Sequence, residues 1–345
     1  MTVATAIATR FESIVGVDGV RSWDALGAER SRFLSALSPS SEPACIVYPD
    51  STEKLGAAIA CARREHWPLL LCGRGSKLNW GGFAEGVRAI VSTANLDRVI
   101  EHAAGDLTLT VEAGVTFAKA RSLLQSSRQR LGFDPAYAES ATLGGIVATG
   151  DSGSLRQRYN SLRDMLLGIQ FVRSDGLTSK AGGRVVKNVA GYDLMKLMTG
   201  AYGTLGCITE LTFRLYPIPE ASKTVMLTGE ADAIASVTMA LLNSSLDPAI
   251  VDLLSADIVR SLDLGSGLGV LVQFQNIPES VDIQAARLVA MGEAWGLSGT
   301  ILADADELFA LVRQQVGVAS ETDNPHASPI ATSRAAWLSS LSGLI

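Results

Sequence analysis

The sequence predicts an α+β protein of two domains, and three observations support this. A chain of 345 residues is longer than one small hydrophobic core normally organises. Short β-branched runs alternate with amphipathic stretches of helical period in both halves of the chain. At Pro217-Ile218-Pro219, two prolines end a predicted strand and stiffen a connection. We therefore expect a helical lead-in over residues 1–40, a larger domain over 41–220 and a smaller domain over 221–345.

The larger domain begins with the strand ACIVYPD, and Asp50 with Glu53 forms a capping-box-like start to the helix STEKLGAAIACARREHW. Three further strands, PLLLCGRGS, RAIVS and LTLTVEAG, precede the helix VTFAKARSLLQSS. Ser174-Asp175-Gly176 then separates two strand-like arms, which predicts a hairpin.

The smaller domain shows a β-α-β-β-α-β order with one more helix, DADELFALVRQQV, at its end. Its strands are SKTVMLTG, AIVDLLS, GLGVLVQFQN and TILA, and its helices are EADAIASVTMALLNSS and SVDIQAARLVAMGEAWG. This order predicts a ferredoxin-like arrangement.

Charge and composition exclude several classes of protein. A net charge of −6 and an isoelectric point near 5.2 disfavour nucleic-acid binding, because no basic stripe is present to neutralise phosphates. No apolar run approaches the roughly 18 residues of a membrane helix, and no basic region precedes the short apolar stretch at the N-terminus. We expect a soluble, cytoplasmic protein. Its four cysteines and three histidines lack the spacing of metal ligands, so no metal site is expected.

The first of three glycine-rich segments is CGRGSKLNWGG, residues 72–82, at the end of a strand. Glycines there allow consecutive backbone N–H groups to form a nest for phosphate oxygens, and Ser76 and Lys77 add donors. The segment is neither GxxxxGK[ST] nor GxGxxG, because Leu78 stands three positions beyond Gly75. A P-loop nucleotidase and a standard Rossmann site are therefore disfavoured, and a plain turn is the alternative.

The second segment is ESATLGGIVATGDSG, residues 139–153. Ser140 or Thr142 can cap a short helix whose first turn contains Gly144 and Gly145. Such a helix start would offer unpaired N–H groups and a positive dipole end to a diphosphate. The alternative is a helix of small residues packed tightly on a neighbour.

The third segment, residues 188–217, places the apolar turn DLMKLM among four glycines before a strand-like run. Each glycine costs about 1 kcal/mol relative to alanine within regular structure, so another group is expected to approach this backbone closely. A helix joined to a strand by an awkward turn is the alternative. Three such segments beside strands favour one extended, phosphate-containing ligand.

The order of the three segments resembles the FAD-binding domain of the vanillyl-alcohol oxidase and p-cresol methylhydroxylase (PCMH-type) superfamily. KNVAGYDLMKL and GAYGTLGCITE are similar to the FAD-binding subunits, GlcE, of bacterial and cyanobacterial glycolate oxidase (glycolate dehydrogenase). The resemblance covers roughly residues 41–220. It implies a two-subdomain, PCMH-type FAD-binding domain, followed by a smaller, ferredoxin-like α+β cap domain.

The resemblance also implies which residues contact FAD: the first loop, the ATLGG segment, the KNVAGYD motif and the GTLGCIT turn. They are Gly73, Arg74, Gly75, Ser76, Lys77, Leu78, Ser140, Thr142, Gly144, Gly145, Thr149, Gly150, Lys187, Asn188, Tyr192, Gly206 and Ile208. The first loop contains no histidine for a covalent link and His66 precedes it, so non-covalent FAD is expected. Cys72, as the last residue of its strand, is expected to point into the core.

The activity that the resemblance implies is oxidation of glycolate, or of a similar 2-hydroxy acid such as D-lactate, with hydride transfer to FAD. Electrons would leave through a partner, because relatives assemble with a second flavin subunit and an iron–sulfur subunit, and membrane association would come through them. A cation should bind the substrate carboxylate, with Arg156, Arg158 and Arg163 as candidates. His102 and His326 are better explained as structural or surface residues, so no catalytic residue is assigned.

The chain ends without the DPxGxxNPG-like return to the flavin found in many relatives, so substrate contacts are expected to be reduced or supplied by another subunit. Two other classes remain open: a stand-alone flavin oxidase or dehydrogenase of another alcohol or hydroxy acid, and a non-catalytic FAD-binding subunit. An enzyme of the UDP-N-acetylmuramate reductase type would need NADPH, for which the KNVAGYD segment offers no support.

Overall fold

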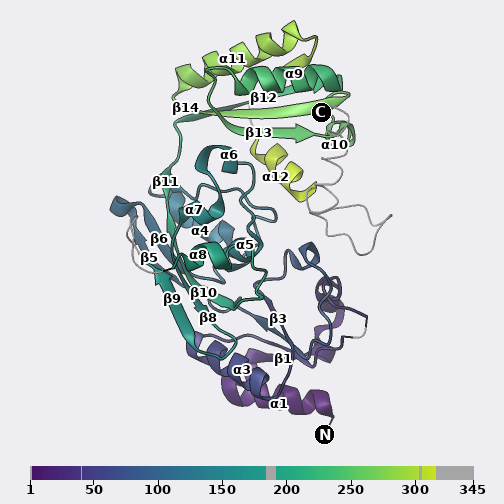
Figure 1. Cartoon of the computed structure of the whole chain (residues 1–345), viewed down its shortest axis with the longest axis vertical. Helices are drawn as coiled ribbons and strands as arrows, with labels where there is room; N and C mark the ends of the chain where they lie inside the picture. Colours follow the sequence, from purple (N-terminus) through teal and green to yellow (C-terminus); the bar gives the residue numbers. More distant parts are fainter. Residues whose placement is uncertain (1, 40, 184–191, 303–304, 316–345) are drawn as a thin grey trace.

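The computed structural model describes residues 2–39, 41–183, 192–302 and 305–315. Three sheets follow one another along the long axis of the molecule (Figure 1). The first lies near the N-terminus, an antiparallel sheet occupies the middle, and a third sheet with two long helices forms the far end. The architecture is α+β, as the sequence predicts.

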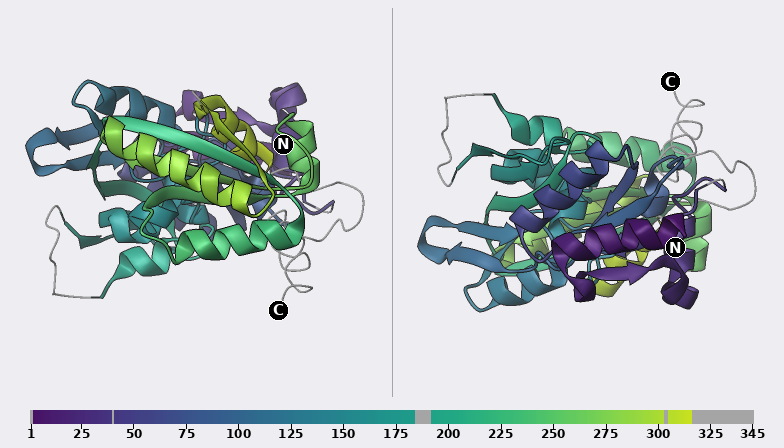
Figure 2. Two further views of the ribbon diagram at one scale, coloured as in Figure 1. Left: turned by 90° about the horizontal axis from the view of Figure 1, so that it is seen from above. Right: turned by 90° about the horizontal axis from the view of Figure 1, so that it is seen from below.

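The first sheet has the strand order β1-β2-β4-β3. β2 (Cys45–Val47) and β3 (Leu69–Cys72) are parallel to β4 (Ala89–Ser92), because α3 (Thr52–Arg64) returns the chain to the same end. α1 (Val3–Val15) packs beside α3 on the outer face (Figure 2).

Two details of this region differ from the prediction. The lead-in is not wholly helical, because Val20–Ser22 form β1, an edge strand antiparallel to β2. Three residues are too few to show an alternating pattern in the sequence. Helix α3 is capped by Ser51, whose hydroxyl accepts from Lys54 N, whereas Asp50 forms an ion pair with Lys54 at 2.7 Å.

The middle sheet is antiparallel throughout, with the order β5-β6-β10-β8-β9. Its strands are β5 (Val99–Ala103), β6 (Thr108–Glu112), β10 (Cys207–Arg214), β8 (Leu166–Val172) and β9 (Thr178–Gly182). Strands β8 and β9 form the predicted hairpin, and Gly176 takes a left-handed φ of 84° in its turn. α4 (Phe117–Gln125) and α5 (Leu143–Thr149) pack on the buried face with Leu109, Ile169 and Phe213.

The third sheet has the order β13-β14-β12-β15, which is the strand order of the ferredoxin-like arrangement, as predicted. The elements are β12 (Ala221–Gly229), α9 (Ala231–Leu242), β13 (Pro248–Leu254), α10 (Ala256–Ser261), β14 (Leu268–Asn276), α11 (Pro278–Ala294) and β15 (Ser298–Leu302). α9 and α11 cover one face through Val225, Leu227 and Phe274 (Figure 2). α12 (Asp306–Gln315) covers part of the other face.

Short helices and strands connect the three sheets and the helices packed on them. They are η1 (Val17–Gly19), η2 (Trp23–Arg30), α2 (Ser31–Leu34), η3 (Leu78–Trp80), η4 (Ala104–Asp106), β7 (Gln129–Arg130), α6 (Arg156–Tyr159), α7 (Leu162–Met165), α8 (Leu194–Met198) and β11 (Tyr216–Pro217). β7 pairs with β11 beside the third sheet, where Arg130 donates to Gln275 of β14 at 2.7 Å.

A cluster of charged side chains joins the middle body to the third sheet. Arg313 of α12 lies 3.0 Å from a carboxylate oxygen of Asp134 and 2.9 Å from one of Asp252 on β13. Asp134 also accepts from Leu155 N at 2.8 Å, and the Ser154 hydroxyl donates to Asp252. Burial raises the pKa of Asp134 to about 6, although the Arg313 charge opposes the rise.

This cluster gives stability a defined dependence on pH. The pKa of Asp134 is about 6 in the folded chain and near 3.8 without the fold, so the folded state binds more protons between these values. As pH falls from 7 to 4, the free energy of unfolding of the natural chain should therefore rise relative to that of Asp134→Asn, by roughly 2 to 3 kcal/mol. Urea unfolding of both chains at several pH values measures this, and parallel pH curves would contradict it.

Candidate functional site

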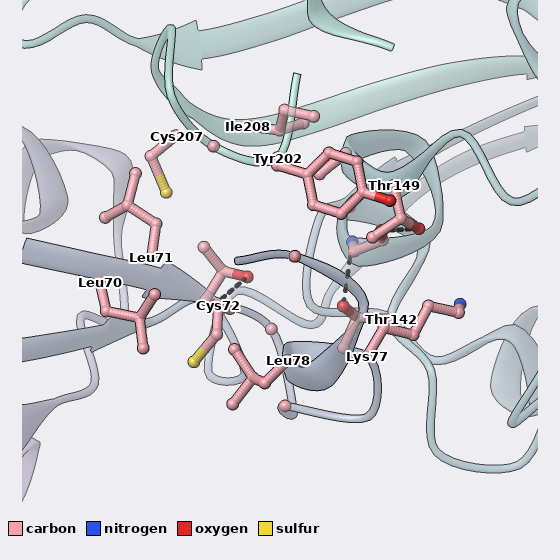
Figure 3. Close-up of a pocket in the computed structure, with 18 of the residues that line it drawn as sticks. Leu70, Leu71, Cys72, Lys77, Leu78, Thr142, Thr149, Tyr202, Cys207 and Ile208 are labelled. Atoms are coloured by element: carbon pink, nitrogen blue, oxygen red, sulfur yellow. Dashed lines mark hydrogen bonds between the residues drawn. The ribbon is translucent and has the colours of Figure 1, made fainter. Parts of the chain in front are cut away.

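A cavity of about 660 Å³ lies between the first and middle sheets (Figure 3). Its walls are β3 with the loop that follows it, the beginning and end of α5, and the segment of residues 202–208 that leads into β10. The volume lies within the range of about 300–1,000 Å³ that is usual for small-molecule and cofactor sites. All three glycine-rich segments of the sequence contribute to it.

The loop after β3 supplies a row of unpaired backbone donors. The N–H groups of residues 74–78 donate to no acceptor within the described part of the chain, and all five residues line the cavity. Gly75 has a left-handed φ of 75°, which turns the chain sharply within the row. Consecutive free amides of this kind form a nest for an anion.

Close contact with the start of α5 fixes the loop. A Cβ placed on Gly73 would lie 2.0 Å from the Thr142 hydroxyl oxygen, so only glycine fits. Ser92 donates to the Gly73 carbonyl oxygen at 2.7 Å and holds the loop from the other side. The loop therefore keeps its shape without a ligand, which is the preorganisation that a binding site needs.

The start of α5 differs from the prediction in one respect. Thr142 caps the helix as expected, with its hydroxyl accepting from Gly145 N at 3.2 Å. The N–H groups of Leu143 and Gly144 already donate to the carbonyls of Val115 and Ala113, both at 2.8 Å. The first turn of α5 therefore has few donors left for an anion, because the chain after β6 passes directly over it.

Lys77 carries a buried positive charge at the cavity wall. Its side chain is 5% exposed, and its Nζ lies 3.0 Å from a carboxylate oxygen of Asp151 and 5.4 Å from the centre of the Trp80 ring. The contact with Asp151 is an ion pair, and the nitrogen of the ammonium group is closed off from solvent. Burial lowers the pKa of Lys77, and the Asp151 charge opposes this.

The third segment forms the wall opposite the loop. Gly206, with a φ of 157°, places its backbone so close to β8 that a Cβ would lie 2.8 Å from the Val172 carbonyl oxygen. Tyr202 N donates to the Ala148 carbonyl oxygen at 2.8 Å, which brings the tyrosine ring beside Thr149 (Figure 3). Burial and the nearby Asp151 charge raise the pKa of Tyr202.

The structure brings twelve of the seventeen predicted contact residues to this cavity: Gly73, Arg74, Gly75, Ser76, Lys77, Leu78, Thr142, Gly144, Gly145, Thr149, Gly206 and Ile208. Ser140 and Gly150 do not line it, and Tyr192 is 91% exposed at the surface. Lys187 and Asn188 lie outside the described residues.

Sequence reasoning missed the apolar wall and two aromatic side chains. Leu69, Leu70, Leu71, Trp80, Thr93, Tyr202 and Cys207 also line the cavity. The sequence signal for Tyr202 was its position between Gly200 and Gly203, where the backbone is expected to allow close approach. Cys72, which was expected to point into the core, both lines the cavity and packs against the core beneath it, and burial raises the pKa of its thiol to about 12.

The arginines considered for substrate binding lie away from the cavity. Arg158 pairs with Asp247 at 3.0 Å, and Arg163 pairs with Asp164 at 3.0 Å. His102 shares a hydrogen bond of 2.8 Å with Gln129, and His326 lies outside the described residues.

Among the described residues, no group of three His, Cys, Asp or Glu side chains is placed to hold a metal ion, and no helix has the length and apolar character needed to cross a membrane.

Comparison with known proteins identifies the ligand of this domain. Residues 43–182 match the family model of the FAD binding domain. This chain shares its fold with the structure of p-cresol methylhydroxylase with substrate bound, with a TM-score of 0.73. The two sequences are 17% identical, and the match covers 95% of this chain and 71% of that one. The chain thus has a PCMH-type FAD-binding fold, and FAD is the cofactor of this domain. The free amides, the glycine-lined wall and the cavity volume fit such a ligand.

The relatives in sequence include glycolate oxidase subunits and D-lactate dehydrogenases. Glycolate oxidase subunit GlcD of Bacillus subtilis is 25% identical over 90% of this chain and 64% of its own length. Glycolate oxidase subunit GlcE of Escherichia coli is 35% identical over 50% of this chain and 49% of its own length. D-lactate dehydrogenase of Archaeoglobus fulgidus is 32% identical over 50% of this chain and 38% of its own length. The matches thus span about two fifths to two thirds of these relatives.

Proposed function

We propose that this chain is the FAD-binding subunit of an oxidoreductase that converts glycolate, or a similar 2-hydroxy acid such as D-lactate, into the 2-oxo acid. The observation that carries the proposal is the row of free amides at residues 74–78 on the wall of a cavity large enough for a dinucleotide. The similarity to GlcD, GlcE and D-lactate dehydrogenase supports the choice of substrate class.

Each wall of the cavity has a proposed role. The amides of residues 74–78 would bind the diphosphate of FAD, and Arg74 would add an exposed positive charge at the same loop. The apolar side chains of β3, Leu69 to Leu71, would cover an aromatic ring of the cofactor. Gly145, Thr149 and Ile208 would lie along the remainder of the ligand. No residue forms a covalent link in this proposal.

The proposed reaction breaks the C–H bond at the α-carbon and the O–H bond of the hydroxyl group, and it forms the carbonyl double bond. FAD, when bound, supplies the two-electron acceptor that takes the hydride. The hydroxyl proton passes to a base, to which no residue is assigned. We further propose that the electrons leave through a second flavin subunit and an iron–sulfur subunit, and that the chain works in the cytoplasm, at a membrane only through those partners.

The experiment that tests this function is an anaerobic visible spectrum of the purified, FAD-loaded chain before and after addition of glycolate and then D-lactate. Loss of the oxidised flavin bands with either acid is expected if the chain carries its own substrate site. Spectra that stay oxidised with the chain alone but bleach after addition of its partner subunits would assign substrate contacts to the complex. Spectra that stay oxidised in both cases would contradict the proposed reaction and leave a non-catalytic FAD-binding subunit.

A further inference from the structure

Tyr202 has a backbone conformation that a tyrosine rarely adopts. Its φ is 52°, in the left-handed region, and Gly200 and Gly203 on either side of it have φ values of 76° and 75°. Glycine takes this conformation without steric conflict, whereas the Cβ of a bulky residue crowds the neighbouring backbone there. The chain thus carries a strained aromatic residue at a position where a third glycine would fold at lower cost.

The backbone contacts of this segment do not explain the tyrosine. Tyr202 N donates to the Ala148 carbonyl oxygen at 2.8 Å, and Gly200 N donates to the Val147 carbonyl oxygen at 3.0 Å. Both carbonyl groups belong to the last turn of α5, where partners within the helix run out. A glycine at position 202 would donate the same hydrogen bond from its own N–H group, so the requirement for tyrosine comes from its side chain.

The ring of Tyr202 belongs to the cavity and not to the core. The residue lines the cavity and is 41% exposed. Its ring lies beside Thr149 of α5 (Figure 3). It also approaches the loop after the amide row, because a Cβ placed on Gly81 would lie 3.7 Å from Tyr202 Cδ1. Thr149 and Gly81 both line the cavity, so the ring lies between two of its walls with aromatic surface open to a ligand.

We infer that the chain retains this strained tyrosine because the Tyr202 ring packs against a planar aromatic ring of the bound cofactor, either adenine or isoalloxazine. The inference rests on the proposed FAD site and adds to it a contact residue beyond residues 43–182, the part that matches the FAD binding domain. Contact between two flat rings removes apolar area from water and adds an attraction specific to aromatic pairs. The ligand contact thus offsets strain that the free chain carries.

Three substitutions at position 202 separate the ring from the backbone. Asparagine tolerates the left-handed conformation, and glycine relieves its strain, so Tyr202→Asn and Tyr202→Gly both remove the ring. Each should lower FAD affinity by about 10- to 100-fold, measured by FAD fluorescence on titration with the apoprotein. Tyr202→Phe keeps the ring and should stay within about threefold of the natural chain. A loss confined to the glycine variant would point to backbone stiffness and overturn the inference.

Urea unfolding of the apoproteins distinguishes ligand contact from a structural role. The equilibrium constant for unfolding of Tyr202→Gly should rise by no more than about threefold, because relief of strain offsets the lost contacts of a partly exposed ring. Arg128→Gly is the matched control, since Arg128 has a φ of 51°, is exposed and lies outside the cavity. It should leave FAD affinity unchanged. A tenfold or larger rise for both Tyr202→Asn and Tyr202→Gly would assign the ring to folding and overturn the inference.

Binding of ADP and of FMN shows which ring the tyrosine contacts. ADP carries adenine without the flavin, and FMN carries isoalloxazine without adenine. Weaker binding of ADP by Tyr202→Asn would support contact with adenine, and weaker binding of FMN would support contact with isoalloxazine. A natural chain that binds FAD, together with a Tyr202→Asn variant that binds it equally well, would overturn this inference alone. A natural chain that binds no FAD would instead refute the proposed function, so the two failures are distinguishable.

Discussion

Gly145→Val is expected to abolish FAD binding while leaving the chain folded. Gly145 lines the cavity, and the one atom near a Cβ at this position is the Thr142 hydroxyl oxygen at 3.0 Å. The valine side chain would thus occupy cavity space and not the core. Because valine is also no worse than glycine within a helix, α5 should persist. We expect a loss of FAD affinity of at least about 100-fold, from filling space that the ligand needs.

Quenching of FAD fluorescence on titration with the apoprotein measures this affinity, and circular dichroism reports the fold. Gly105→Val is the matched control, because a Cβ at Gly105 meets no atom within 4 Å and the residue lies outside the cavity. This variant should bind FAD as the natural chain does. A Gly145→Val chain that retains full FAD affinity would remove the start of α5 from the site.

Arg313→Met should produce the largest loss of stability among single substitutions of charged residues at the junction. Arg313 is the shared partner of Asp134 and Asp252, and the three side chains are 14%, 24% and 20% exposed. Removing the arginine leaves two poorly solvated carboxylates facing each other, for which we expect a loss of roughly 2 to 4 kcal/mol. The loss should be smaller at pH 5 than at pH 8, because protonation of Asp134 removes one of the two charges.

Chemical unfolding at the two pH values measures this loss. Arg260→Met is the control, since Arg260 pairs at the surface with Asp257 and its side chain is 74% exposed. Such an exposed pair contributes little, so the control should stay near the natural stability at both pH values. A loss for Arg313→Met that is independent of pH would show that packing of α12, and not charge, holds the junction together.

The fold was largely predictable because its periodic elements are long or bounded by strong turn signals. The hairpin at Ser174-Asp175-Gly176 and the strand–helix order beyond residue 220 each follow from local patterns. Strand β1 and the short helix α10 were not predictable, because each has six residues or fewer and owes its conformation to neighbours. The N-cap of α3 is Ser51 and not the predicted Asp50. Both residue types are suitable caps, and only the backbone conformation decides between them.

The parts of the candidate site where glycines allow the backbone to approach closely were predictable from the sequence. Contacts between residues that are distant in the sequence were not. Gly73, Gly145 and Gly206 all line the cavity, as their segments indicated. The satisfied amides at the start of α5 depend on the chain after β6, about thirty residues earlier, and no local pattern reveals them. The Lys77–Asp151 pair likewise joins two segments that are distant in sequence.

The most direct test of this account is the visible spectrum of the purified chain after incubation with FAD and removal of unbound ligand. The account predicts oxidised flavin bands with about one FAD per chain, all of it released into solution when the protein is denatured by heat or acid. It also predicts that Gly105→Val retains these bands and that Gly145→Val lacks them. A natural chain that folds, as judged by circular dichroism, but stays colourless and leaves FAD fluorescence unchanged would contradict the account at its centre.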